Sequence, residues 1–209
     1  MKWTESGNSK PFEQAPVGAQ VGRCIKMIDI GTQTGEWQGK PTHRRQVILS
    51  WELPNCLMTE GESAGKPFIV SKFYTASLGE KATLRHDLEA WRGRAFTEEE
   101  LAGFDSKNIM GKSCLLGLIT KNEKTRVGTI MQLPTGMPVP NQVNKSVFFS
   151  LDEFDKDVFD SLSDGIKTMI MASPEYQAIA SPQPSGNGFE DMPDDKPWDD
   201  SKLDEDIPF

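Results

Sequence analysis

Apolar and polar residues alternate most clearly between Arg44 and Trp51, where the pattern predicts a strand with one buried face. Arg45, Val47, Leu49 and Trp51 fall on one side, and the residues between them fall on the other, with the period of two that β-strands show. Four further segments have a strand-like pattern: residues 20–30, 68–76, 114–121 and 126–133. Two segments are rich in turn-forming residues and predict a loop and a turn: residues 31–41 and 122–124.

Helical patterns lie between the third and fourth predicted strands and again near the end of the chain. Leu84, Leu88 and Trp91 share one face of a helix, so we expect Trp91 to lie in the core. Two pairs have the spacing of a capping box at a helix start: Ser77 with Glu80, and Thr97 with Glu100. An amphipathic helical region is expected over residues 152–180.

Five strands with a helix between the third and fourth form the element order of the OB-fold, a small Greek-key barrel. The predicted fold class is therefore mainly β, an OB-fold-like five-stranded barrel with an inserted helix, a C-terminal helical region and a disordered acidic tail. We divide the chain into a polar lead-in, an OB-fold-like domain, a helical appendage and the tail: residues 1–15, 16–150, 151–180 and 181–209.

Charge is distributed unevenly along these segments. Residues 1–150 carry 19 Lys and Arg against 15 Asp and Glu, for a net charge of +4. Residues 181–209 carry 2 against 9, for a net charge of −7. A pI near 4.9 thus hides a mildly basic body, which suits a polyanionic partner such as nucleic acid.

A protein that binds single-stranded DNA needs cations along a groove and exposed aromatic faces on which bases stack. Trp37, in the predicted glycine-rich loop, and Tyr74, on the third strand, are the candidate stacking residues, whereas Phe73, Trp51 and Trp91 are expected in the core. The candidate DNA-binding cations are Lys40, Arg44, Arg45, Lys72, Arg92, Arg94, Lys112, Lys124 and Arg126. For Arg92 and Arg94, ion pairs with neighbouring carboxylates are an equal alternative: Glu89, Glu98 and Glu99.

The last six residues place three carboxylates before a short apolar end. They are Asp204, Glu205, Asp206, Ile207, Pro208 and Phe209. This tip resembles the C-terminal peptide of bacterial and phage single-stranded-DNA-binding proteins. The resemblance implies a docking peptide that recruits a primase, helicase, polymerase or nuclease, with Phe209 in an apolar pocket and its carboxylate on an Arg or Lys. The alternative is a disordered acidic end that only keeps the protein soluble.

Four segments, in the order in which they occur along the chain, resemble sequences of a family of phage and prophage replication-module proteins. Members of that family are described as single-stranded-DNA-binding or of unknown function. They are Ile28–Gln33, Leu49–Glu52, Ser71–Leu78 and Asp87–Thr97. The resemblance spans about residues 16–180, and it implies the same OB-fold and DNA-binding function.

Catalytic motifs find little support. His43 and His86 lack metal-ligand spacing, and no nucleophile elbow is present. Residues 111–113 read Gly-Lys-Ser, but the first glycine of a P-loop is replaced by Ser106. We therefore expect neither an enzyme nor a cofactor.

The cellular setting follows from cysteine usage and hydropathy. The three cysteines fit neither a disulfide framework nor a metal site, so we expect reduced thiols: Cys24, Cys56 and Cys114. The sequence has no apolar run long enough for a membrane span and no signal-peptide pattern, which predicts the cytoplasm of a bacterial host cell.

The predicted function is non-sequence-specific binding of single-stranded DNA in phage DNA replication or recombination. Two alternatives stay open. One is a protein–protein adaptor of the replication module without DNA affinity, and the other is an acidic DNA mimic that inhibits a host nucleic-acid enzyme.

Overall fold

The computed structural model describes residues 13–181 except residue 38. Its sheet contains strands β1 (Gly18–Trp37), β2 (Lys40–Leu57), β3 (Pro67–Thr75), β4 (Ser113–Lys121), β5 (Lys124–Met131) and β6 (Val147–Phe149). Its α-helices are α1 (Thr83–Arg92), α2 (Glu98–Ala102), α3 (Lys156–Ser161), α4 (Asp164–Met171) and α5 (Pro174–Ala180). Short 3-10 turns occur at Gly61–Ser63 and Ser106–Ile109.

The fold is mainly β, with the predicted helix between β3 and β4. Five antiparallel strands follow the order β3-β2-β1-β4-β5, and β6 adds to β1 in parallel. The two ends of this path, β3 and β5, lie against each other. No ladder of strand pairing joins them in the described residues, so the sheet has an OB-like order without forming a closed barrel.

The loop predicted over residues 31–41 is wrong, because β1 and β2 continue through it as a hairpin, here called the arm (residues 32–44). Their pairing runs to Trp37 opposite Lys40. Apart from Trp37 and Pro41, the arm consists of polar residues and glycine, so it has no apolar period to reveal a strand. At its base, Gly31 has a φ of 70°, and an added Cβ would lie 2.4 Å from Ser173 Oγ. Glycine thus allows α5 to approach β1 closely.

One face of β1 and β2 lines the main core. Trp51 and Trp91 are both buried, as predicted, with ring centroids 6.0 Å apart. The indole Nε1 of Trp91 donates to the Ser113 carbonyl at 2.9 Å, which fixes α1 against β4. The capping box predicted at Ser77 and Glu80 is wrong, since α1 begins at Thr83 and no side chain caps it.

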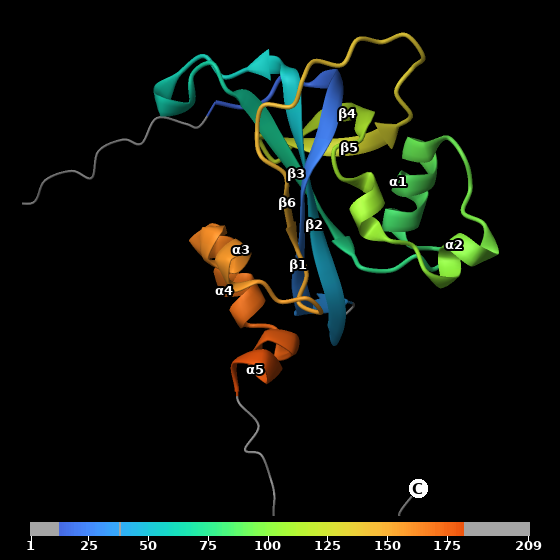
Figure 1. Ribbon diagram of the computed structural model, residues 1–209, viewed down its shortest axis with the longest axis vertical. Coiled ribbons are helices and arrows are strands. Elements are labelled where there is room, and N and C mark those ends of the chain that lie inside the picture. The colour runs from blue at the N-terminus through green and yellow to red at the C-terminus, as the bar shows by residue number, and fades with distance from the viewer. Residues whose placement is uncertain (1–12, 38, 182–209) are drawn as a thin grey trace, which may run out of the picture.

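The opposite face of the same two strands is also buried. Ile28, Ile30 and Ile48 pack there against apolar residues of β6 and the C-terminal helices. Figure 1 shows α3–α5 and β6 on one side of β1 and β2, with α1 and α2 on the other. The predicted helical region therefore consists of three short helices that cover the outside of the sheet.

The described cysteines carry no disulfide, and burial raises the pKa of Cys24 to about 12. Cys114 is buried as well, whereas Cys56 is partly exposed. Within the described part of the chain, no helix has the length and apolarity that crossing a membrane requires.

Candidate nucleic-acid interface

Phe73 and Tyr74, which are neighbours on β3, have the opposite roles to those predicted. Lys72 and Tyr74 do share one face, but that face is turned toward α1: Tyr74 is only 3% exposed, and its hydroxyl donates to Asp87 Oδ2 at 2.8 Å. Lys72 Nζ binds the same Oδ2 at 2.6 Å. Burial, together with the Asp87 carboxylate, raises the pKa of Tyr74. Phe73, expected in the core, is 50% exposed on the other face.

Phe73 belongs to an exposed row that we call the β3 strip. Its members face outward from β3 or border it: Arg44, Ile69, Ser71, Phe73, Thr75 and Arg126. Ile69, Phe73 and Arg126 line a hollow of about 250 Å³ where β5 meets β3. Arg44 and Thr75 line a second hollow of about 440 Å³ at the other end of β3. The strip thus offers one aromatic face between two guanidinium groups.

Two hairpins flank the β3 strip. Lys40 is exposed on the arm, and the side chain of Trp37 lies outside the described residues. The predicted turn at residues 122–124 is confirmed, with φ values of 52° and 59° at Asn122 and Glu123. Lys124, the last residue of the predicted turn and the first of β5, is exposed. In an OB-fold the corresponding loops border the oligonucleotide groove.

The guanidinium of Arg45 is held by carboxylates of the protein itself. Its guanidinium binds the buried carboxylate of Asp29, with Nε 3.2 Å from Oδ2, and binds Asp152 Oδ1 at 2.9 Å. Asp29 also accepts hydrogen bonds from the backbone N–H groups of Gly31 and Leu151. Hydrogen bonds to the carboxylates of Asp29 and Asp152 raise the pKa of Arg45. Because Asp152 belongs to the helical appendage, Arg45 joins the sheet to that appendage, which is a structural role.

Residues 13–15 line the hollow beside Phe73, although the sequence predicted only a polar lead-in there. Glu13, Gln14 and Ala15 line the same hollow as Phe73. The Glu13 carboxylate accepts hydrogen bonds from Thr59, through both the backbone N–H and the hydroxyl. These bonds lower the pKa of Glu13 and place a carboxylate at the rim of the β3 strip.

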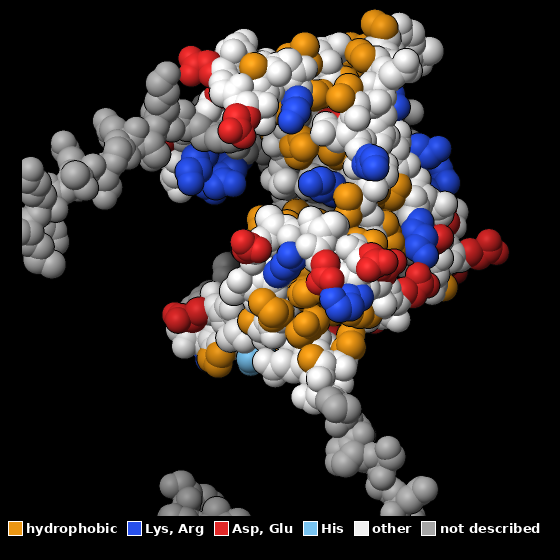
Figure 2. Space-filling model, turned by 60° about the vertical axis from the view of Figure 1, so that its left-hand side comes forward, with side chains coloured by type: hydrophobic (Ala, Val, Ile, Leu, Met, Phe, Trp, Pro, Cys, Tyr) orange, Lys and Arg blue, Asp and Glu red, His pale blue; other side chains and the backbone are white. Residues whose placement is uncertain are grey.

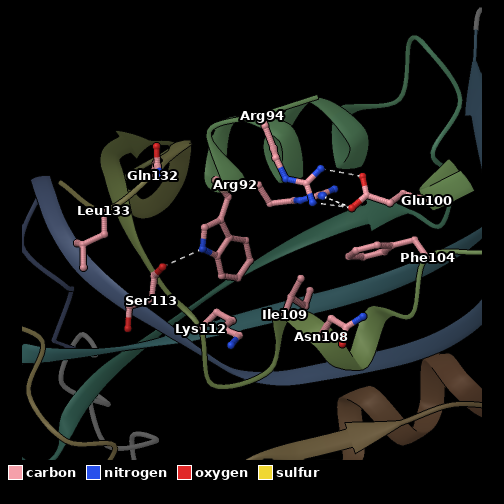
Figure 3. A pocket seen from close by; sticks show the side chains of 11 residues that line it. Arg92, Arg94, Glu100, Phe104, Asn108, Ile109, Lys112, Ser113, Gln132 and Leu133 are labelled. Carbon is pink, nitrogen blue, oxygen red and sulfur yellow. Dashed lines mark hydrogen bonds and ion pairs between the residues drawn. The ribbon is translucent and has the colours of Figure 1, made fainter. Parts of the chain in front are cut away.

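Arg92, Arg94 and Lys112 come together elsewhere, around the cavity of about 590 Å³ shown in Figure 3, here called the α1–β4 pocket. Both arginines bind Glu100, with Arg94 Nη2 2.7 Å from Oε1. The partner is therefore Glu100, and not Glu89, Glu98 or Glu99, which were the expected alternatives.

Glu100 was recognisable in the sequence only as a capping residue, and that prediction is confirmed. Its carboxylate accepts from the Thr97 backbone N–H at 3.0 Å, and the Thr97 hydroxyl accepts from the Glu100 N–H. The Arg94 guanidinium and the Thr97 N–H lower the pKa of Glu100 to about 2. Arg92 also lies over the Phe96 ring, 4.3 Å from its centroid. This network fixes the wall of the α1–β4 pocket.

Several DNA-binding candidates remain available for a ligand. In the described part of the chain, five of them are exposed without an ion-pair partner: Lys40, Arg44, Lys112, Lys124 and Arg126. Figure 2 shows several Lys and Arg side chains among apolar and uncharged neighbours in the upper middle of this face, and acidic side chains at its upper left and, mixed with cations, lower down.

The described residues contain no group of His, Cys, Asp and Glu that could hold a metal ion. His43 and His86 are both exposed. The predicted docking tip, Asp204 to Phe209, and the rest of the acidic tail lie outside the described residues. Neither a protein-family model nor a curated protein sequence matches the chain.

Proposed function

We propose that this protein binds single-stranded DNA without sequence preference, through the β3 strip and its flanking hairpins, during phage DNA replication or recombination. The supporting observation is the half-exposed Phe73 between Arg44 and Arg126, two exposed arginines without an ion-pair partner in the described residues. An aromatic face stacks on any base, and the cations bind the phosphates on either side. Tyr74 is removed from the proposed set of stacking residues because it is buried.

In this proposal the C-terminal tip, Asp204 to Phe209, recruits a second replication or recombination protein. The support is its sequence, with three carboxylates followed by Ile-Pro-Phe. Charged and apolar groups in that order suit a pocket with a basic rim.

Fluorescence anisotropy with a labelled oligo-dT strand tests the DNA-binding proposal. Phe73→Ala should weaken binding by about 1–3 kcal/mol, the contribution of one stacked base. Arg126→Glu should weaken it and also reduce the salt dependence, because each phosphate contact adds roughly −0.7 to the log–log slope. Ile179→Ala is a matched control, since Ile179 is similarly exposed at 45% but lies on α5.

The same assay separates the alternatives when it is repeated on a chain that ends at residue 181. A body with no measurable affinity for oligo-dT would contradict the proposal and favour the adaptor. Unchanged affinity in well-folded Phe73→Ala and Arg126→Glu variants would show that DNA binds elsewhere on the body.

A further inference from the structure

The α1–β4 pocket is separate from the β3 strip and is built from four different segments. Trp91 lies at the end of α1 and Arg94 two residues after that helix. Glu100 lies in α2 and Phe104 follows it, whereas Lys112 directly precedes β4 and Gln132 directly follows β5. Because β4 runs from Ser113 to Lys121, the pocket and the Lys124 turn lie at opposite ends of the β4–β5 hairpin. A volume of about 590 Å³ lies within the range of small-molecule sites.

The charge around this pocket suits one phosphate. Three cations line it against the single carboxylate of Glu100. Arg92 and Arg94 are already committed to Glu100, so Lys112 is the lining cation whose ammonium has no partner in the described structure. An ammonium without a partner binds a phosphate as a point charge, and Arg94 adds to the attraction at longer range.

The remaining lining suits a hydrogen-bonding ring. Trp91, Phe104 and Ile109 form an apolar wall, and Figure 3 shows the amides of Asn108 and Gln132 on different sides of the pocket. Both amides are exposed, and neither makes a hydrogen bond within residues 13–181, so each has a donor and an acceptor free. Gly93 allows Gln132 to lie against the end of α1, since an added Cβ would be 2.1 Å from Gln132 Oε1.

From these features we propose that the α1–β4 pocket binds one nucleotide, with its phosphate at Lys112 and its base along the apolar wall, facing one of the two amides. A peptide with several carboxylates would need several unpaired cations, which this wall does not offer. The nucleotide is either free or part of a nucleic-acid strand. This site goes beyond the proposed function, because it does not share residues with the β3 strip.

Isothermal titration of the full-length protein with the four deoxynucleoside monophosphates, and separately with inorganic phosphate, tests this site. We expect saturable binding of the nucleotides and affinity for phosphate alone that is lower by about tenfold or more, since the base adds its own contacts. Lys112→Glu should weaken nucleotide binding by about tenfold or more, because it replaces the phosphate partner with a like charge. Asn108→Ala or Gln132→Ala should weaken it by a few-fold.

One control separates this site from general charge effects. Lys145→Glu makes the same charge change at another exposed lysine and should bind mononucleotides like the unchanged protein. If Lys112→Glu also weakens binding of an oligo-dT strand, the nucleotide belongs to the strand, and if only mononucleotide binding falls, the ligand is free.

Three results would overturn the nucleotide site. One is the absence of saturable mononucleotide binding, and another is equal affinity for phosphate alone, which would leave only an anion site. The third is that a synthetic peptide with the sequence of residues 203–209 binds more tightly than the mononucleotides and that Lys112→Glu abolishes this peptide binding. The pocket would then be a peptide site. Thermal melting of each variant verifies folding, and Asn108→Ala and Gln132→Ala leave every ion pair in place.

Discussion

Two adjacent arginines on β2 should behave in opposite ways when each is replaced by methionine. Arg45 binds the buried carboxylate of Asp29 and the exposed carboxylate of Asp152, and its side chain is 34% exposed. Arg44 is exposed, has no ion-pair partner in the described residues, and lies at one end of the β3 strip. Methionine keeps much of the length and apolar stem of either side chain while it removes the charge.

The expected loss of stability for Arg45→Met follows from the burial of Asp29. Removing one partner of a buried ion pair costs about 3–5 kcal/mol, because the other charge stays behind. Here water reaches a third of the arginine, and Gly31 and Leu151 still donate hydrogen bonds to Asp29. We therefore expect a loss of about 2–3 kcal/mol for Arg45→Met, and a change within about 0.5 kcal/mol for Arg44→Met.

Urea unfolding measures the stability of both variants, and anisotropy with oligo-dT over a range of salt measures their DNA binding. Arg44→Met should reduce the log–log salt slope by roughly 0.7, the contribution of one phosphate contact. Arg45→Met should leave the log–log salt slope of oligo-dT binding unchanged at temperatures where this variant is folded. A loss of stability below about 1 kcal/mol for Arg45→Met would refute the reasoning about the buried pair. Equal loss of DNA affinity in both variants would restore Arg45 to the interface.

Three further outcomes are expected. Tyr74→Ala should lower the free energy of unfolding by about 3–5 kcal/mol, measured by urea, because it empties a buried aromatic site; a neutral result would contradict its core position. Glu100 has a pKa of about 2 in the folded protein against an ordinary value of 4.5, so its contribution to stability is present above the ordinary value and is lost as the pH falls toward 2. Glu100→Gln should flatten that decline in unfolding midpoints measured between pH 4.5 and 2, and an unchanged profile would count against the network. Deleting residues 201–209 should tighten oligo-dT binding modestly at low salt, because a tethered acidic segment competes with the strand. Phe209→Ala alone should abolish recruitment of a purified replication partner. If that partner still binds the Phe209→Ala variant, the tail acts only through generic acidic attraction.

The sequence pattern determined most of the secondary structure where apolar periodicity was strong. The alternation around Val47 and Leu49 identified β2, and the spacing of Leu88 and Trp91 identified the buried face of α1. The capping box at Thr97 is local, because it involves residues three positions apart, so the sequence was sufficient to predict it.

The arm was missed because its strands are stabilised by pairing with each other and not by an apolar face. Glycine and proline over residues 31–41 indicated a loop, yet β1 and β2 remain in register up to Trp37 and Lys40. Partner strands supply the backbone hydrogen bonds of such a ribbon, and single-strand periodicity carries no information about them.

The candidate site depended on tertiary contacts. Alternation correctly separated Phe73 from Tyr74, but only the position of α1 decides that the Tyr74 face is the buried one. Arg45 likewise reads as a free cation until Asp29 and Asp152, from β1 and the appendage, are placed beside it. The periodicity of a strand or helix determines which of its residues share a face. Packing between segments that are distant in the chain determines which element covers that face, and therefore which side chains stay exposed and can bind a ligand.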